Sequence, residues 1–124
     1  MNPTNTPEIS AAAPAKGIWF GNFCFSEPAL LPCFVPASNS GVFAILVSDP
    51  SYFPRSWRPL YFGESENIPA YLTPWHEKYA QWCEIAGSAI KLYVAFLPLD
   101  SADDRRAVLA DLIAQYQPES NVTS

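Results

Sequence analysis

The run VFAILVS occupies residues 42–48 and decides how the rest of the chain is interpreted. It is short, apolar and in part β-branched, which is typical of a strand that is buried on both faces. Asp49-Pro50 ends this run, and a second strand-like run, Leu60-Tyr61-Phe62, follows and stops at Gly63. We therefore predict a β-hairpin with a long connection, in which residues 42–47 pair antiparallel with residues 60–62.

The remaining elements follow outward from this hairpin. A third strand is predicted over residues 89–97, and a helix over residues 74–86. Ser101 followed by Asp104 resembles a capping pair at the start of a helix over residues 101–116. This order predicts an α+β fold in which a small three-stranded antiparallel sheet is flanked by helices, after an irregular Pro-rich N-terminal segment.

Length and composition indicate one domain. The chain has 124 residues, of which 49% are hydrophobic, and this is enough to fill one core. Residues 1–16 are rich in Pro, Thr, Asn and Ala, and we predict that they form a flexible N-terminal tail. Residues 17–121 are predicted to form the single domain.

Charge and cysteine content indicate which cellular compartment and which binding partners suit this chain. Seven Lys and Arg residues against twelve Asp and Glu residues give a net charge of −5. This charge works against non-specific binding to a phosphate backbone, because such binding depends on cationic side chains that release counterions. The three cysteines form no close pair and are expected to be reduced thiols. With no recognisable signal peptide and no long apolar run, we expect a cytoplasmic protein that does not engage a membrane.

Short motifs within residues 41–121 resemble the GIY-YIG nuclease superfamily. Gly41-Val42-Phe43 and Tyr61-Phe62-Gly63 are similar to the two strand motifs that give the family its name. The closing signature of the family resembles residues 105–113, followed by Tyr116, Pro118 and Asn121. The resemblance implies a GIY-YIG-like domain, and the chemistry of that family is phosphodiester hydrolysis with one divalent cation.

The same resemblance implies that the catalytic set is degenerate in this chain. The family has a tyrosine in each strand motif, an arginine on the first helix and a metal-binding glutamate on a later helix. The matched positions here are Phe43, Tyr61, Tyr71 and Leu109, so that only Tyr61 is retained. A hard cation needs an anionic oxygen ligand, and the charge that develops on a phosphate needs a fixed cation. We therefore expect a pseudoenzyme that binds a protein or a nucleic acid and needs no cofactor, with homodimer formation as a further option.

Candidate nucleic-acid-binding residues lie on a loop predicted over residues 51–59. Arg55, Trp57 and Arg58 alternate basic and aromatic side chains, a combination that can contact a phosphate and stack on a base. Loop tips also carry such residues without any partner, and both interpretations stay open at this point. A stripe of Trp75, Tyr79 and Trp82 is expected in the core, or, if its helix is exposed, on a protein-binding face.

Two other functions remain open on the sequence alone. A divergent, active endonuclease would use Tyr61 and His76 as catalytic groups and Glu64 or Glu66 to bind Mg²⁺ or Mn²⁺. The ordinary roles of these residues are a packed strand tyrosine, a surface or capping histidine and a solvated acidic helix start. The other function is that of a small interaction domain unrelated to the nucleases.

Overall fold

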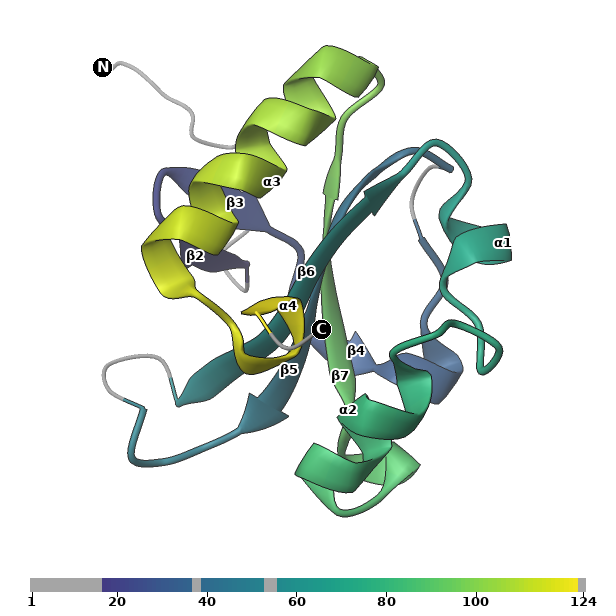
Figure 1. Ribbon diagram of the computed structural model, residues 1–124, viewed down its shortest axis with the longest axis vertical. Helices are drawn as coiled ribbons and strands as arrows, with labels where there is room; N and C mark the ends of the chain where they lie inside the picture. The colour runs from purple at the N-terminus through teal and green to yellow at the C-terminus, as the bar shows by residue number, and fades with distance from the viewer. Residues whose placement is uncertain (1–16, 37–38, 53–55, 123–124) are drawn as a thin grey trace, which may run out of the picture.

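The computed structural model describes residues 17–36, 39–52 and 56–122. In these residues the chain has an α+β fold with two antiparallel sheets, of two and four strands, and four α-helices (Figure 1). The tail predicted over residues 1–16 lies outside the described residues. No helix in the described part of the chain combines the length and the apolar character that crossing a membrane requires.

The larger sheet has the strand order β4-β7-β5-β6, and the smaller sheet is the hairpin β2–β3. The strands are β2 (Ile18–Phe20), β3 (Phe23–Phe25), β4 (Ala29–Leu30), β5 (Gly41–Ser48), β6 (Trp57–Ser65) and β7 (Tyr93–Pro98). The α-helices are α1 (Ile68–Tyr71), α2 (Tyr79–Ala86), α3 (Ala102–Tyr116) and α4 (Glu119–Val122), and the two 3₁₀ turns are η1 (Leu31–Cys33) and η2 (Ala89–Lys91).

The predicted hairpin is confirmed, and β5 lies at the centre of the sheet. β5 pairs antiparallel with β6 on one side and with β7 on the other, and every residue of β5 except the last is buried. The sheet nevertheless has four strands where three were predicted, because the two-residue strand β4 pairs with β7. Pro28 and Pro32 flank β4 closely, and because proline is unfavourable in strands, no strand was predicted there.

The second strand begins earlier than predicted and continues to Ser65, past Gly63, where it was predicted to stop. β6 starts at Trp57, so Trp57 and Arg58 lie in a strand and the prediction of a loop there was wrong. A register shift after Ile45 brings Pro59 opposite Leu46. Proline is tolerated in this position because β6 is an edge strand and the pairing is irregular there.

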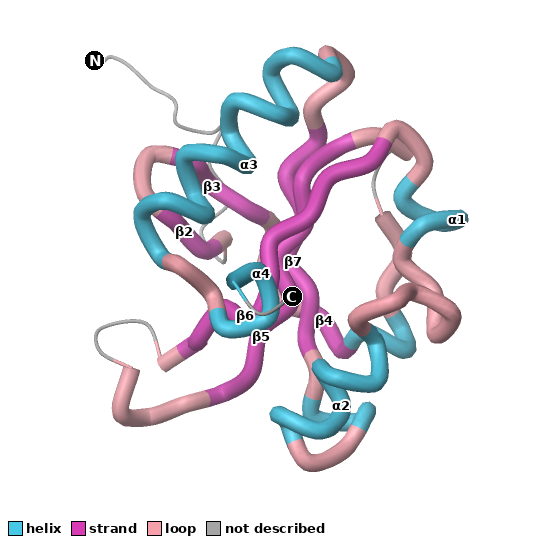
Figure 2. Tube along the Cα trace, in the orientation of Figure 1, coloured by secondary structure: helices cyan, strands magenta, loops and turns pink. Residues whose placement is uncertain are grey.

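Side chains of β5 alternate between two apolar clusters on opposite faces of the sheet. Helix α3 and the β2–β3 hairpin cover one face, called here the α3 face, whereas α1 and α2 cover the other, the α2 face (Figures 1 and 2). The buried residues of the α3 face are Ile18, Phe20, Phe25, Val42, Ala44, Leu46, Phe62, Ala95 and Leu112. Those of the α2 face are Phe43, Ile45, Val47, Leu60, Ile68, Trp82, Leu92, Val94 and Phe96.

Local hydrogen bonds decide where the helices begin. The Ser101 hydroxyl accepts a hydrogen bond from Asp104 N at 3.3 Å, which confirms the predicted cap of α3. Helix α2 starts at Tyr79 and not at Pro74, because the Thr73 hydroxyl accepts from Trp75 N and the ring of His76 accepts from a backbone amide. Such side-chain bonds to the backbone compete with helix formation and hold this segment in turns.

The chain end is attached to the edge strand. Phe62 N donates a hydrogen bond to Asn121 Oδ1 at 2.7 Å, and Asn121 Nδ2 donates to Phe62 O at 2.9 Å. Trp82 Nε1 donates to the hydroxyl of Ser120 at 3.1 Å, which joins the same segment to α2. Asn121 therefore has a structural role in this chain, next to the central residue of the Tyr61-Phe62-Gly63 motif.

Candidate functional site

Three of the positions matched to the nuclease family come together on the α2 face. Phe43 extends from β5, Tyr61 from β6 and Tyr71 from α1. The ring centroid of Phe43 lies 6.0 Å from that of Tyr61 and 6.0 Å from that of Tyr71. Gly63 leaves room for this arrangement, because a Cβ atom there would lie 2.5 Å from Cζ of Phe43. The glycine of the second strand motif is thus required by the phenylalanine of the first.

The hydroxyl of Tyr61 is held in its protonated form. Burial, followed by hydrogen bonding with Tyr71, raises the pKa of Tyr61 far above its ordinary value. The ring also packs against Trp82 at a centroid distance of 5.2 Å and against His76 at 5.7 Å. A phenol in this state can donate a hydrogen bond but is a poor candidate for the deprotonation of water at neutral pH.

His76 is a neutral ring enclosed by other rings. Its centroid lies 4.7 Å from that of Tyr71 and 4.8 Å from that of Trp82. Nδ1 accepts a hydrogen bond from Lys78 N at 3.0 Å, so the neutral imidazole carries its proton on Nε2. Nε2 is buried and has no hydrogen-bond partner in the described part of the chain. Burial is the largest influence on this residue and lowers the pKa of His76, while neighbouring Glu77 acts in the opposite direction.

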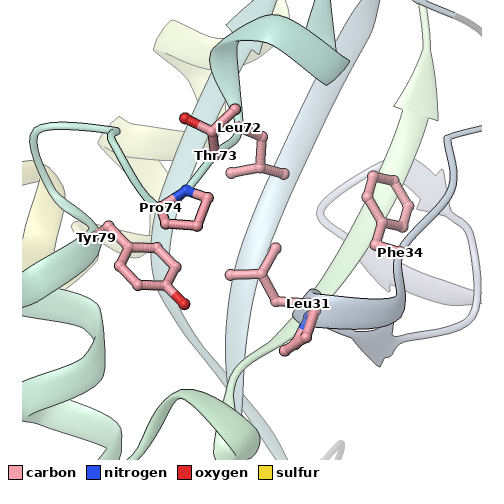
Figure 3. Close-up of a pocket in the computed structure, with 7 residues that line it drawn as sticks. Leu31, Phe34, Leu72, Thr73, Pro74 and Tyr79 are labelled. Carbon is pink, nitrogen blue, oxygen red and sulfur yellow. The ribbon is translucent and has the colours of Figure 1, made fainter.

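Two pockets flank the turns between α1 and α2. The first, called the aromatic pocket, has a volume of about 310 Å³ and is lined by Ala70, Tyr71, Thr73, Trp75, His76 and Glu77. The second, called the apolar pocket, has a volume of about 350 Å³ and is lined by Leu31, Pro32, Phe34, Leu72, Thr73, Pro74 and Tyr79. Figure 3 shows the apolar pocket, where Pro74 and Tyr79 face Leu31 and Phe34 across the opening. Thr73 borders both pockets.

Trp75 differs from the other members of its predicted stripe. Tyr79 and Trp82 pack in the cluster of the α2 face, as expected, but the side chain of Trp75 is 91% exposed. Helix α2 begins only after Trp75, so the packed stripe of the helix does not extend to this residue. The sequence pattern alone gave no sign of this exposure, since the spacing of Trp75 fits the stripe.

The fourth matched position, Leu109, lies on the other side of the sheet. Its half-buried side chain packs with the cluster of the α3 face, whereas Tyr61 packs with that of the α2 face. Glu64, a candidate metal ligand, accepts a hydrogen bond from Arg105 Nε at 2.8 Å. Arg105 is buried and also donates to the backbone carbonyls of Leu99 and Asp100, so Glu64 neutralises a buried guanidinium.

Metal-binding groups do not converge in the part of the chain that is described. Glu66, the other candidate ligand, is exposed at the start of the α1 turn. Among residues 17–36, 39–52 and 56–122, no three His, Cys, Asp or Glu side chains are placed to hold a cation together.

The predicted nucleic-acid residues also have partners within the fold. The Trp57 ring packs on the α3 face, and its centroid lies 4.9 Å from that of the Tyr93 ring. Arg58 Nε donates to Asp49 Oδ2 and Arg58 Nη1 donates to Glu119 Oε1, both at 3.1 Å. Arg55 lies outside the described residues. The charge of Arg58 is therefore matched by two carboxylates of the chain itself.

Comparison with known proteins does not indicate a function for this site. No protein-family model matches the chain, and no curated protein or solved structure has significant similarity to it. Its function is therefore inferred from the residues and geometry of the α2 face.

Proposed function

We propose that this chain is a GIY-YIG-like domain that no longer hydrolyses phosphodiesters and acts by binding a protein partner with its α2 face. The observation that carries this proposal is the ring contact among Phe43, Tyr61 and Tyr71, at centroid distances of 6.0 Å from Phe43 to each tyrosine. Three elements bring three of the four matched positions together, whereas Leu109 lies on the opposite face. What they form is a packed aromatic cluster, not a set of exposed polar groups.

This cluster is poorly suited to hydrolysis. Phe43 has no hydroxyl group. Burial and hydrogen bonding with Tyr71 raise the pKa of Tyr61, so its hydroxyl stays protonated. Tyr71 stands where the family has the arginine that stabilises the charge developing on the phosphate, and a neutral phenol cannot replace that cation. Leu109, at the position of the metal-binding glutamate, contributes to an apolar cluster on the opposite face.

The surface beside the cluster is suited to binding. Trp75 is 91% exposed and Tyr71 is 39% exposed, and both line the aromatic pocket. Exposed tryptophan and tyrosine are enriched at protein interfaces, where they often contribute most of the binding energy. The apolar pocket begins on the other side of Thr73 and adds a second recess for a partner's side chain.

A protein partner is favoured over a nucleic acid by charge. The chain carries a net charge of −5, and Arg58 is engaged with Asp49 and Glu119. Affinity for a phosphate backbone depends on cationic side chains that are free to replace counterions. Steep salt dependence of binding to DNA or RNA would identify a nucleic acid as the partner and would overturn this choice.

The second candidate function is a divergent endonuclease, and one contact favours it. Tyr61 and His76, which would act as its catalytic groups, have ring centroids 5.7 Å apart. However, Nδ1 of His76 is already used as an acceptor by Lys78 N, and Glu64 is paired with Arg105. Catalysis would require both groups to leave these partners.

A cleavage assay separates the two candidates. Purified protein is incubated with duplex, single-stranded and branched DNA and with RNA, in the presence of Mg²⁺ or Mn²⁺. We expect no cleavage above the level of a Tyr61→Phe variant, because the cation and the transition-state charge both lack their usual partners. Metal-dependent cleavage that disappears in Tyr61→Phe would establish the endonuclease.

A capture experiment tests the binding face. Wild-type protein, Trp75→Ala and Trp19→Ala are immobilised at equal density, and the retained proteins are quantified at low and high salt. Trp19 is a matched control, because it is also an exposed tryptophan but lies on β2. We expect specific partners to be retained by the wild type and by Trp19→Ala but lost by Trp75→Ala. Equal retention by all three proteins would contradict the assignment of the α2 face.

A further inference from the structure

The aromatic pocket has walls made mainly of rings. Tyr71, Trp75 and His76 line it together with the small residues Ala70 and Thr73 and with Glu77. The rings of Tyr71 and His76 stand almost perpendicular to each other, at an interplanar angle of 83°. Trp75 is almost fully exposed, so its indole is free to close over a bound group. Tyr71 and His76 touch each other and form one wall, so an organic group that enters the pocket would contact this wall on one side and the Trp75 indole on another.

The electrostatics of the pocket favour a cation. The faces of aromatic rings carry partial negative charge, and an ammonium group within about 6 Å of a ring centroid is attracted to it. Glu77 is the acidic residue of the lining, and the described lining contains no Lys or Arg. Lys78 follows Glu77 in the chain and does not line the pocket, although its charge also acts on His76, with a smaller effect than that of Glu77. His76 adds no opposing charge at neutral pH, because burial lowers its pKa.

Hydrogen-bonding capacity distinguishes a methylated ammonium from an unmodified one. A lysine ammonium has three N–H donors that need acceptors once water is removed. In the pocket, the Thr73 hydroxyl already accepts one hydrogen bond, from Trp75 N. Glu77 is the one carboxylate among the described lining residues, so an unmodified ammonium would find a single charged acceptor for its three donors. A trimethylammonium group keeps the positive charge, has no N–H donors and presents methyl groups to the rings.

We propose that the aromatic pocket binds the trimethylammonium group of a methylated lysine side chain on a protein partner. This inference rests on the proposed protein-binding function and names the chemistry that the partner presents. Tyr71, Trp75 and His76 contact the methyl groups, and Glu77 supplies the countercharge at the rim.

The test compares three short peptides that differ at one side chain. They carry trimethyllysine, unmodified lysine, or a neutral analogue in which carbon replaces the quaternary nitrogen. Binding to the full chain is measured by titration calorimetry for wild type and variants, and the NMR signal of the Trp75 indole N–H reports the site in the proteins that retain Trp75. We expect the trimethyllysine peptide to bind about tenfold more tightly than the neutral analogue, the size of a cation–π contribution in a partly desolvated site. Equal affinity for the charged and neutral peptides, or tighter binding of unmodified lysine, would overturn the proposal.

Matched variants assign the effect to the pocket. Trp75→Ala should weaken binding of the trimethyllysine peptide about tenfold, with Trp75→Phe in between, and Glu77→Gln should weaken it and reduce its salt dependence. For Trp75→Ala the remaining Trp signals and thermal stability report whether the fold is intact. Trp19→Ala is the control and should bind as the wild type does, because Trp19 lines a different pocket, against α3. Unchanged binding by Trp75→Ala would overturn the proposal.

Failure of this inference is distinguishable from failure of the proposed function. If protein capture depends on Trp75 but the trimethyllysine peptide does not bind, the binding function stands and the methyllysine assignment is wrong. If metal-dependent cleavage is found instead, the proposed function is wrong whatever the peptides do.

Discussion

The two faces of the central sheet are built from different kinds of side chain. On the α3 face, Phe20 makes edge contacts with Phe25, Phe62 and Tyr116 at centroid distances of 5.4 to 5.6 Å. The polar tip of Tyr116 is satisfied there, because its hydroxyl accepts a hydrogen bond from Gly21 N at 2.8 Å. On the α2 face, aromatic residues with polar tips meet beneath short helices and turns, and Nε2 of His76 is buried without a partner in the described structure.

This difference between the faces indicates that fold stability and partner recognition depend on different sides of the sheet. A buried polar atom without a hydrogen bond lowers stability, and a tryptophan held in solvent contributes no burial energy to the fold. Both features lie on the α2 face, next to two pockets, whereas the α3 face is covered by the fifteen-residue helix α3. We infer that the α3 face serves mainly to stabilise the fold, whereas the α2 face both contributes to the core and has the residues that contact a partner.

The strongest test of this comparison is a truncation on the α3 face. Phe20 is fully buried and touches three other rings, so Phe20→Ala removes packing and leaves a cavity. We expect a loss of about 3–5 kcal/mol in the free energy of unfolding, measured with urea. The wild-type slope of the transition is the control for two-state behaviour. A loss below about 1 kcal/mol would mean that the α3 face is not the stabilising one.

A smaller effect is expected at Leu109, on the same face. Its side chain is half-buried among the residues under α3, so Leu109→Ala should cost about 2–3 kcal/mol, towards the low end for a leucine truncation. Leu109→Glu introduces the glutamate that the resembled nuclease family has at the matched position, and it should also destabilise the fold, because it places a carboxylate against apolar side chains. It should not produce metal-dependent cleavage, since Tyr61 lies on the opposite face. Cleavage by this variant in the same nuclease assay would show that the two faces cooperate.

The sequence predicted the parts of the fold that depend on repeated local patterns. The pairing of β5 with β6, the third strand from Tyr93 onward and the Ser101 cap of α3 follow from hydrophobic runs and turn residues. The start predicted for the third strand was wrong, because residues 89–91 form the 3₁₀ turn η2. The late start of α2 was missed, because it depends on hydrogen bonds of Thr73 and His76 to nearby amides that outweigh the helical spacing of Trp75. The role of Trp57 was missed because its partner, Tyr93, is distant in the sequence.

The candidate site was predictable only in part, for the same reason. Phe43, Tyr61, Tyr71 and Leu109 were singled out together through the family resemblance, and the structure brings the first three together but places Leu109 on the opposite face. The enclosure of His76 between Tyr71 and Trp82, and the pairing of Glu64 with Arg105, depend on the tertiary arrangement of four elements. Residue type and spacing carry no information about such contacts.

Acidification should act on the α2 face before it acts on the rest of the fold. Burial lowers the pKa of His76 in the folded state, so the unfolded chain binds more protons below about pH 6.5, the ordinary histidine value. The contribution of His76 is therefore complete above that pH and is lost as the pH falls towards the folded-state pKa. Protonation also removes the Nδ1 acceptor used by Lys78 N and places a charge among Tyr61, Tyr71 and Trp82.

The measurement is the urea midpoint at a series of pH values from about 7.5 down to about 5.5. His76 is the one histidine of the sequence, so His76→Phe is a direct control and should flatten this part of the profile. If the urea midpoint fell with pH equally in wild type and in His76→Phe, the loss of stability would come from carboxylates and not from His76. The α2 face would then not be the more acid-sensitive of the two faces.

The smallest effect on stability is expected at Trp75, where the effect on binding should be large. The side chain is 91% exposed, and the hydrogen bond to Thr73 comes from its backbone amide, which alanine retains. Trp75→Ala should therefore change the free energy of unfolding by no more than about 0.5 kcal/mol, as is usual for an exposed position without packing partners. Urea unfolding of the variant beside wild type gives this number, and partner capture or peptide binding gives the second readout. A loss above about 1.5 kcal/mol would show that the indole packs on the fold in solution, and Trp75 would then belong to the core of the α2 face and not to its binding surface.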